Sequence, residues 1–456
     1  MKKERETQLQ ENKMGTMAIN PLLLSISVPM MVSMLVQALY NIVDSIFVSR
    51  ISEDALTAVS LAFPMQSVLI AMGVGTGVGV NAILSKKLGE KQFEEADKIA
   101  NISVVVSFCE YLVFLLVGIF LTRFYFTIQT DDLAIIEYGT TYMSICLVMS
   151  FGMFGQFCFE KLLQSTGRTM YTMITQTVGA VINIIFDPIL IFGMFGAPKL
   201  GIAGAAIATV AGQIVATILA VIFNIKYNKD IHLHIRQMRP KRSVIAKIFR
   251  VGIPSILMQS IGSVTVFWMN LILLGFTPTA AAVFGIYFKL QSFIFMPVFG
   301  LNNGVIPIIA YNYGAGNKER ILKTMRYGMV YSVSIMLIGF IIVETLTALL
   351  LGFFQPTDYM LEIGVPALRI ISICFVPAGF SIVASGAFQA LNKSVYSLFL
   401  ATARQLVILI PAAYLLAMTD KLVMVWFAFP IAEIGSALVT VFLLQKTMKH
   451  LNAALG

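Results

Sequence analysis

The sequence predicts an all-α membrane protein with twelve transmembrane helices in two pseudo-symmetric six-helix lobes. Three observations lead to this fold class: 58% of the 456 residues are hydrophobic, only 12% are charged, and apolar runs long enough to cross a bilayer recur along the chain. Soluble domains carry about a quarter charged residues. The composition therefore excludes a disordered chain, a secreted disulfide scaffold, a nucleic-acid-binding domain and most soluble enzymes.

The apolar runs set the boundaries of the predicted helices, because a helix needs about 20 apolar residues to cross the hydrocarbon core. Runs of that length lie at 20–48, 54–84, 99–121, 133–163, 170–194, 200–226, 248–274, 279–310, 324–352, 359–389, 395–417 and 422–446. Several are long enough to tilt or to extend past the hydrocarbon. The predicted organisation is an N-terminal tail (1–19), an N-lobe (20–226), an inter-lobe loop (227–247), a C-lobe (248–446) and a C-terminal tail (447–456).

The basic residues predict the orientation of the chain. Of the 32 Lys and Arg, 25 fall in the two tails and in alternate loops, four fall in the other loops, and three (Lys289, Arg369 and Arg404) fall within spans. The loop that begins at Lys161 is counted among the basic ones. Basic loops face the cytoplasm. We therefore expect a multi-pass protein of the cell membrane with both termini cytoplasmic. On this interpretation the net charge of +9 reflects the basic residues of the cytoplasmic loops and tails.

The two halves repeat each other at a constant offset of 225 residues. The matching residues include Pro29 and Pro254, Gln66-Ser67 and Gln291-Ser292, Gly75 and Gly300, Gly79 and Gly304, and Gly89 and Gly314. Six spans per half give both halves the same orientation, so the pseudo-two-fold axis runs along the membrane normal. Such parallel repeats favour a transporter with a central cleft between the lobes.

Polar side chains form stripes on three helices of the N-lobe. A carboxylate at mid-bilayer costs about 2.5–3.5 kcal/mol on insertion scales, so each one needs a reason. Helical spacing joins Ser33, Gln37, Asn41 and Asp44 in the first span, with Tyr40 beside them. The other stripes are Thr172, Gln176, Asn183 and Asp187 in the fifth span, and Thr209 and Gln213 in the sixth. The uncharged members could instead connect helices through hydrogen bonds. Asp44 and Asp187 favour a functional, water-accessible cavity.

Four other intramembrane acids receive different interpretations. Glu110, Glu160 and Glu344 are interpreted as mainly interfacial or structural. Glu433 could partner Lys289 or Arg404 within its lobe, or it could have a role toward the substrate. Pro29 lies about four turns before Asp44 and permits a bend, since it removes one backbone hydrogen bond. The four cysteines lack metal-ligand spacing and no GxxxxGK[ST] motif occurs, so we expect no cofactor and no direct use of ATP.

These residues resemble those of the multidrug and toxic compound extrusion (MATE) family, in particular its DinF-like branch, which includes the MepA-type efflux pumps. The resemblance extends over essentially the whole chain. It is carried by PMMVSMLVQALYNIVDSIFVSR, VINIIFDPILIFG, VGIPSILMQ and GVIPIIAYNYGAGN, in that order. It implies two six-helix lobes around a central cavity, and export coupled to inward flow of H⁺ or Na⁺.

The resemblance also implies roles for single residues. Asn41 and Asp44 match the first-helix Asn-x-x-Asp that carries the coupling acid, and Pro29 resembles a first-helix proline proposed to bend when that acid is protonated. The cation site, with Na⁺ as one candidate occupant, resembles Asp44 together with Asn183, Asp187 and Thr209, and Tyr142 looks like a tyrosine near it.

The resemblance places Gln37 in the wall of the substrate cavity, and we expect Tyr40, Asn41 and Gln176 to line it too. The NorM-like branch uses a seventh-helix Glu, where this chain has Gln259, and Met269 stands at the repeat partner of Asp44. Ion coupling is therefore predicted in the N-lobe.

The predicted function is export of amphipathic, often cationic molecules by a non-enzymatic, monomeric antiporter that needs only its ligands and the bilayer as partners, and no nucleic acid. Burial disfavours the ionised form of an acid, so a protonated Asp44 and a bound substrate are expected to compete. The main alternative is a flippase of lipid-linked or polysaccharide intermediates from the same superfamily. A major-facilitator carrier is a weaker one, because SKKLGEKQFEEA lacks the Gly-x-x-x-Asp-x-x-Gly-Arg-Arg pattern of that class.

Overall fold

The computed structural model describes residues 12–234, 238–354 and 356–455. The first half contains α2 (Lys13–Thr16), α3 (Ile19–Ser49), α4 (Glu53–Gly89), α5 (Phe93–Phe120), α6 (Thr122–Thr127), α7 (Leu133–Val148), α8 (Phe151–Ser165), α9 (Thr169–Phe192), the short η1 (Met194–Gly196) and α10 (Ile202–Tyr227). The second half contains α11 (Arg242–Leu274), α12 (Pro278–Gly314), α13 (Lys318–Gly352), α14 (Asp358–Ser372), α15 (Phe375–Ala390), α16 (Ser394–Thr402), the π-helix η3 (Ala403–Leu409), α17 (Ile410–Ala417), α18 (Leu422–Trp426) and α19 (Ala428–Leu455).

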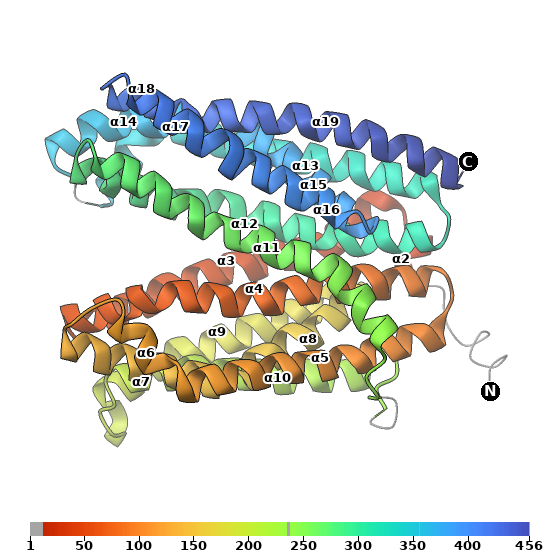
Figure 1. Ribbon diagram of the computed structural model, residues 1–456. Helices are drawn as coiled ribbons and strands as arrows, with labels where there is room; N and C mark the ends of the chain where they lie inside the picture. Colours follow the sequence, from red (N-terminus) through yellow and green to blue (C-terminus); the bar gives the residue numbers. More distant parts are fainter. Residues whose placement is uncertain (1–11, 235–237, 355, 456) are drawn as a thin grey trace.

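The helices form two bundles that lie side by side, with α3–α10 in one and α11–α19 in the other (Figure 1). Ten continuous segments in the described part of the chain are long and apolar enough to cross a membrane. Two bent pairs, α7 with α8 at 44° and α14 with α15 at 45°, bring the number to twelve when each pair counts as one span. The all-helical fold class predicted from the sequence is confirmed.

The two bundles follow the same plan at the 225-residue offset. Glu53 and Pro278 begin α4 and α12, which end at Gly89 and Gly314. The starts of α5 and α13, α7 and α14, and α9 and α16 keep the same spacing, and the two bent pairs occupy equivalent places. A backbone irregularity repeated in both halves belongs to the duplicated plan and not to a local sequence accident.

Several helices extend further than the apolar runs. α11 begins at Arg242 within the predicted inter-lobe loop, and α19 continues through the predicted C-terminal tail to Leu455. The predicted start of the loop at Lys161 is wrong, because α8 continues to Ser165 and Lys161 is buried within this helix. Charged turns can continue a helix beyond the hydrocarbon, so hydropathy alone underestimates helix length. Residues 1–11, 235–237 and 456 of the predicted tails and loop lie outside the described residues.

The lobes meet through the first two helices of each half. α3 packs against α12, and α11 packs against α4, so the first helix of each lobe contacts the second helix of the other lobe. Gly89 of α4 and Gly314 of α12 lie where these two helices approach each other closely. A Cβ at Gly89 would clash with the Tyr311 carbonyl oxygen, and one at Gly314 with the Lys86 carbonyl oxygen. These glycines allow the two backbones to touch at the end of the bundle that holds α2.

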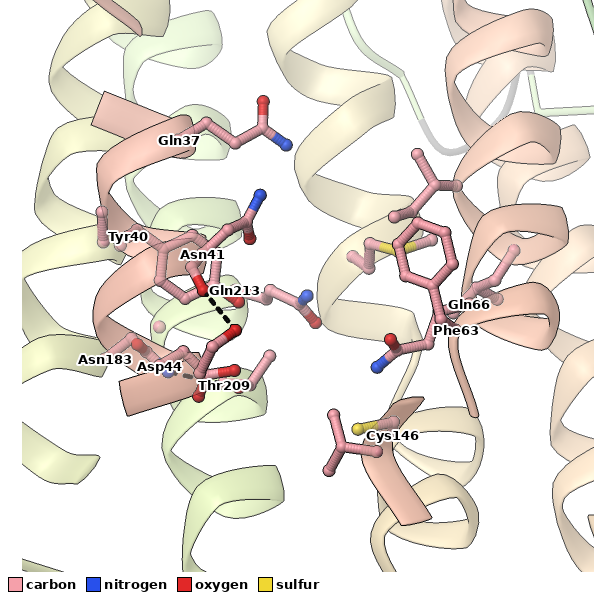
Figure 2. A pocket seen from close by; sticks show the side chains of 18 of the residues that line it. Gln37, Tyr40, Asn41, Asp44, Phe63, Gln66, Cys146, Asn183, Thr209 and Gln213 are labelled. Atoms are coloured by element: carbon pink, nitrogen blue, oxygen red, sulfur yellow. Dashed lines mark hydrogen bonds between the residues drawn. The ribbon is translucent and has the colours of Figure 1, made fainter. Parts of the chain in front are cut away.

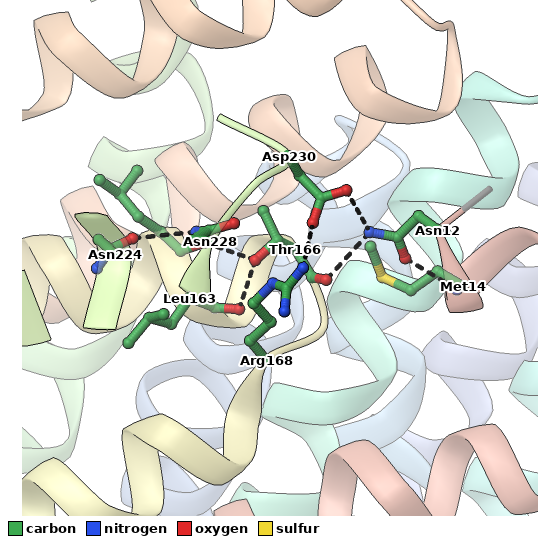
Figure 3. A network of polar contacts seen from close by, with 9 residues as sticks. Asn12, Met14, Leu163, Thr166, Arg168, Asn224, Asn228 and Asp230 are labelled. Carbon is green, nitrogen blue, oxygen red and sulfur yellow. Dashed lines mark hydrogen bonds and ion pairs between the residues drawn. The ribbon is translucent and has the colours of Figure 1, made fainter. Parts of the chain in front are cut away.

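The short helix α2 connects both lobes at that end. Asn12 Nδ2 donates to the Thr166 carbonyl oxygen and to Asp230, which also pairs with Arg168 at 3.2 Å (Figure 3). On the C-lobe side, Arg320 donates to the Met14 and Met17 carbonyl oxygens. Burial and the neighbouring Arg168 guanidinium lower the pKa of Lys13. Part of the predicted N-terminal tail is thus a packed element of the fold.

Candidate functional site

The N-lobe encloses a cavity of about 600 Å³. Its walls come from α3, α4, α7, α8, α9 and α10. Gln37, Asn41 and Asp44 extend from α3 on one side, and Phe63 and Gln66 from α4 face them across the space (Figure 2). The three polar stripes read from the sequence therefore converge, because their helices surround one space. Of the predicted residues, Gln37, Tyr40, Asn41, Asp44, Tyr142, Gln176, Asn183 and Thr209 all line it.

Two acids lie together at one wall of the cavity. Asp44 is partly exposed to the cavity, whereas Asp187 is fully buried directly behind it, and the two carboxyl groups interact. Asp44 Oδ1 and both oxygens of Asp187 are buried and accept no hydrogen bond from the described residues. Neither acid has an ion-pair partner there, and no basic residue lines the cavity. Two such carboxyls cannot both stay ionised without strong repulsion, so the pair is suited to hold a proton or a small cation.

Neutral polar groups surround this acid pair. Asn183 Nδ2 donates to Thr209 Oγ1 at 3.2 Å, which leaves the buried Asn183 Oδ1 without a donor. The Tyr40 hydroxyl is within hydrogen-bond reach of Thr209. Oxygen atoms from Asp44, Asp187, Asn183 and Thr209 are thus gathered in one place, and hard cations prefer such oxygen ligands.

The α4 side of the cavity adds a contact that the sequence interpretation missed. Gln66 Nε2 donates to the Tyr142 hydroxyl at 3.1 Å and fixes that predicted residue at the cavity wall. A signal was present in the sequence, since Gln66 and Gln291 are both polar residues inside apolar spans at the repeat offset. Each of them lines a cavity in its own lobe.

Glu160 has contacts that the sequence interpretation missed, and of the two interpretations given to it, interfacial or structural, they support the structural one. Its carboxylate is 1% exposed and accepts hydrogen bonds from Gln156, Thr175 and Gln176 at 2.7–3.0 Å. Gln176 therefore lines the cavity with its amide nitrogen already engaged. The neighbouring Lys161 donates to Gln164 and, across the lobe interface, to Asn303. Glu160 is a structural group next to the cavity.

Pro29 lies within α3, which continues through it without a break. The carbonyl oxygen of Pro29 accepts a hydrogen bond from Ser33 Oγ at 2.9 Å, and both residues are buried. The hinge role of Pro29 stays a prediction. Thr172 is also buried and donates toward the Glu160 carbonyl oxygen, so Ser33 and Thr172 belong to helix packing.

The intramembrane acids Glu433 and Glu344 of the C-lobe have partners among the described residues, in contrast to Asp44 and Asp187 at the N-lobe cavity. Glu433 Oε2 accepts from Arg404 at 3.2 Å, which confirms one of the two partners considered for it. Glu344 accepts from Ser372 and lies near Arg369, at 3.9 Å. Met269, at the repeat position of Asp44, is fully buried in the apolar core of its lobe. Glu110, in the N-lobe, is buried and accepts from Thr76.

Comparison with known proteins agrees with this architecture. The MatE family model matches residues 29–189 and 254–415, which together make up more than half of the chain. The chain belongs to the MatE family. The two matches begin 225 residues apart, at the offset found in the sequence and in the helix boundaries.

Curated relatives named multidrug export proteins match 80% or more of this chain, and solved structures of MATE proteins match nearly all of it. Multidrug export protein MepA of Staphylococcus saprophyticus is 27% identical over 80% of each chain, and that of Staphylococcus haemolyticus is 26% identical over 93% of each. A structure described as the outward-facing conformation of a multidrug resistance MATE family transporter of the MOP superfamily superposes with a TM-score of 0.92. It shares 24% identity and covers 98% of this chain and 99% of its own.

A MOP superfamily transporter from Pyrococcus furiosus, described by the reverse polarity of its binding pocket, superposes with a TM-score of 0.91. It shares 23% identity and covers 97% of this chain and 99% of its own. These superpositions confirm the fold predicted from the sequence.

Proposed function

We propose that this MATE protein exports amphipathic, often cationic compounds by antiport with H⁺ or Na⁺, coupled through Asp44. The observation that carries the proposal is an acid pair set at the wall of a cavity large enough for a small molecule, with no basic partner among the described residues. The relatives named multidrug export proteins support export of drugs or toxins as the activity. We infer transport and not catalysis, with the single chain as the working unit.

The placement in the membrane is part of the proposal. Both termini face the cytoplasm of a cell membrane, as the distribution of Lys and Arg indicates. The contact between the lobes at Gly89 and Gly314 then closes the cytoplasmic side. Asp44 lies near the other end of α3, toward the outside. In this state an ion from the exterior reaches the acid pair before the lobes rock.

Coupling follows from competition at one site. A substrate cation in the N-lobe cavity is attracted by the ionised acid pair, and a proton or Na⁺ arriving at Asp44 and Asp187 removes that attraction. Asn183 and Thr209 contribute oxygen atoms beside the ion, and Tyr142 holds the opposite wall. Gln37, Tyr40, Asn41 and Gln176 face the substrate. Pro29 lies on the same helix and transmits the change as a bend.

The energy available fits this scheme. One elementary charge that crosses 100 mV is worth about 2.3 kcal/mol, enough for roughly a 50-fold gradient of a neutral substrate. For a monovalent cation exchanged one for one with a proton, the electrical terms cancel and only the pH difference drives export. A second ion at Asp187 would restore the electrical term.

The test is dye efflux from proteoliposomes with the pH gradient and the sodium gradient imposed separately. At least one gradient is expected to drive efflux by the wild type, and Asp44→Asn is expected to abolish it while still inserting and folding. Glu344→Gln is the matched control, because it neutralises an intramembrane acid outside the cavity. Full gradient-driven efflux by Asp44→Asn would contradict the proposal. Translocation of a lipid-linked sugar, with no dye movement under either gradient, would establish the flippase alternative.

A further inference from the structure

The C-lobe contains a second cavity, of about 890 Å³, with a different lining. Its walls come from α11, α12, α15, η3 and α19, closed on one side by α4. The charged residues among those that line it are Lys289, Arg404 and Glu433, which leave a net charge of +1. Eight aromatic rings surround these groups: Phe63, Phe267, Phe284, Tyr287, Phe288, Phe295, Phe299 and Phe429. Charged residues are rare inside membrane spans, so a cavity that combines aromatic rings with a net positive charge is unusual.

Arg404 reaches the chamber from the π-helix η3, which interrupts the span formed by α16 and α17. A single-turn π-bulge inside an α-helix is frequently found at functional sites. A guanidinium carries five N–H donors, and Glu433 is the only hydrogen-bond partner of Arg404 among the described residues. The pair is also incomplete on the acid side, since Glu433 Oε1 is buried without a donor. Most of the donor capacity of Arg404 is therefore unused.

Lys289 is the free cation of the chamber. Its side chain is exposed to the cavity, and no carboxylate in residues 12–234, 238–354 or 356–455 forms an ion pair with it. Its ammonium group lies 5.8 Å from the centroid of the Phe354 ring, which compensates only part of the cost of placing a charge there. The position lies eleven residues into α12, well inside the span. A charge inside a membrane span is costly, and one that faces a cavity without an acidic partner indicates a functional site.

We propose that the C-lobe cavity is a binding site for an aromatic monoanion, whose negative group is held by Lys289 and Arg404 and whose rings pack among the phenylalanines. One free ammonium and one partly neutralised guanidinium match a single negative charge. They do not match a pyrophosphate, which carries more charge and no rings. The inference concerns a different cavity from the proposed coupling site, so it goes beyond the proposed export mechanism and does not depend on it.

The test is equilibrium binding of radiolabelled 2-naphthoate to the purified full-length protein in nanodiscs of zwitterionic lipid. Saturable binding to the wild type is expected. Lys289→Gln should raise the Kd about tenfold, equal to about 1.4 kcal/mol. Lys421→Gln is the matched control, because it removes the same charge from an exposed residue outside either cavity. It should leave the Kd within about twofold of the wild type.

A second variant acts in the opposite direction and separates binding from folding. Glu433→Gln keeps the shape of the side chain, removes the one negative charge of the chamber and frees Arg404, so it should tighten naphthoate binding roughly threefold to tenfold. A variant that merely damages the fold would not bind more tightly. The proposal is overturned if naphthoate does not bind saturably or if Lys289→Gln binds as the control does. Displacement by inorganic pyrophosphate at lower concentration than by unlabelled naphthoate would overturn it as well.

Discussion

The two lobes share one backbone plan and carry opposite electrostatics. The N-lobe cavity has one lining acid, Asp44, with Asp187 behind it and no base, whereas the C-lobe cavity has two bases and one acid. Phe63 and Ile70 of α4 form part of both walls, so the two cavities adjoin. The two lobes therefore share the arrangement of their helices and differ in the charges of their cavities.

Two pairs of equivalent positions illustrate the divergence. Asp44 corresponds to Met269, which packs in the apolar core, and Gly179 corresponds to Arg404. In the N-lobe a Cβ at Gly179 would lie 3.0 Å from the Gly212 carbonyl oxygen, so glycine brings α9 and α10 together. In the C-lobe the same place is a π-helix that carries a guanidinium. The equivalent positions therefore differ both in the local backbone and in the charge they bring to the cavity.

The largest expected effect comes from placing an acid in the C-lobe at the position equivalent to Asp44. Met269→Asp should destabilise the protein by about 4–5 kcal/mol, because the new carboxyl would be buried among apolar side chains without a partner. Met269→Leu, which nearly conserves volume, should cost less than about 1.5 kcal/mol. The loss is measured as the drop in Tm of the nanodisc-reconstituted protein. An Asp variant as stable as the Leu variant would show that the position faces water.

A smaller loss should follow from removing the C-lobe base. Arg404→Gln leaves Glu433 buried and unpaired, at a cost of about 3 kcal/mol, and adding Glu433→Gln should recover most of it. The Tm values of the single and double variants measure the difference. If the double variant is no more stable than Arg404→Gln alone, the ion pair is not the cause.

Neutralising an N-lobe acid should change stability in the other direction. Asp187→Asn removes a buried carboxyl to which the described part of the chain directs neither a base nor a hydrogen-bond donor. We therefore expect a gain of about 1 kcal/mol together with weaker gradient-driven export. Tm and proteoliposome efflux are measured on the same preparation. A fall in Tm as large as that of Arg404→Gln would mean that the acid pair is stabilised by an interaction comparable to the C-lobe ion pair.

The smallest effect concerns the repeat-related glutamines. Gln66→Leu removes the hydrogen bond to Tyr142 and should weaken binding of a cationic dye about fivefold, or about 1 kcal/mol. Gln291→Leu lies in the other cavity and should change that affinity less than about twofold. Dye fluorescence titrations of both variants in nanodiscs provide the comparison. Equal losses would show that the dye extends across both cavities.

The sequence predicted the fold well because its determinants are local or periodic. Apolar run length located every span, and the constant offset predicted a duplication that the helix starts reproduce. The N-lobe cavity could also be predicted from the sequence, because Asp44, Asn183 and Asp187 follow helical spacing on helices that pack together. Helix ends were less accurate, as Arg242 and Leu455 show, because charged turns continue past the bilayer.

Features that depend on partners from distant helices could not be predicted in this way. Glu160 receives hydrogen bonds from α9 as well as from its own helix, and nothing in its neighbourhood in the sequence indicates Thr175. The C-lobe cavity gathers Lys289, Arg404 and Glu433 from three separate segments. The sequence marked each of these residues as unusual, but only packing shows that they share one space.

The central claim is that an ion at Asp44 and a cationic substrate exclude each other. The most direct test under proton coupling is proton release when a cationic dye binds the purified protein in weakly buffered detergent solution at pH 7, followed with a pH indicator. In sodium-free solution the wild type should release a proton, on the order of one per dye bound at most, because binding and protonation are reciprocally linked. Asp44→Asn should still bind dye and release none. Equal release by the wild type and Asp44→Asn would contradict the account.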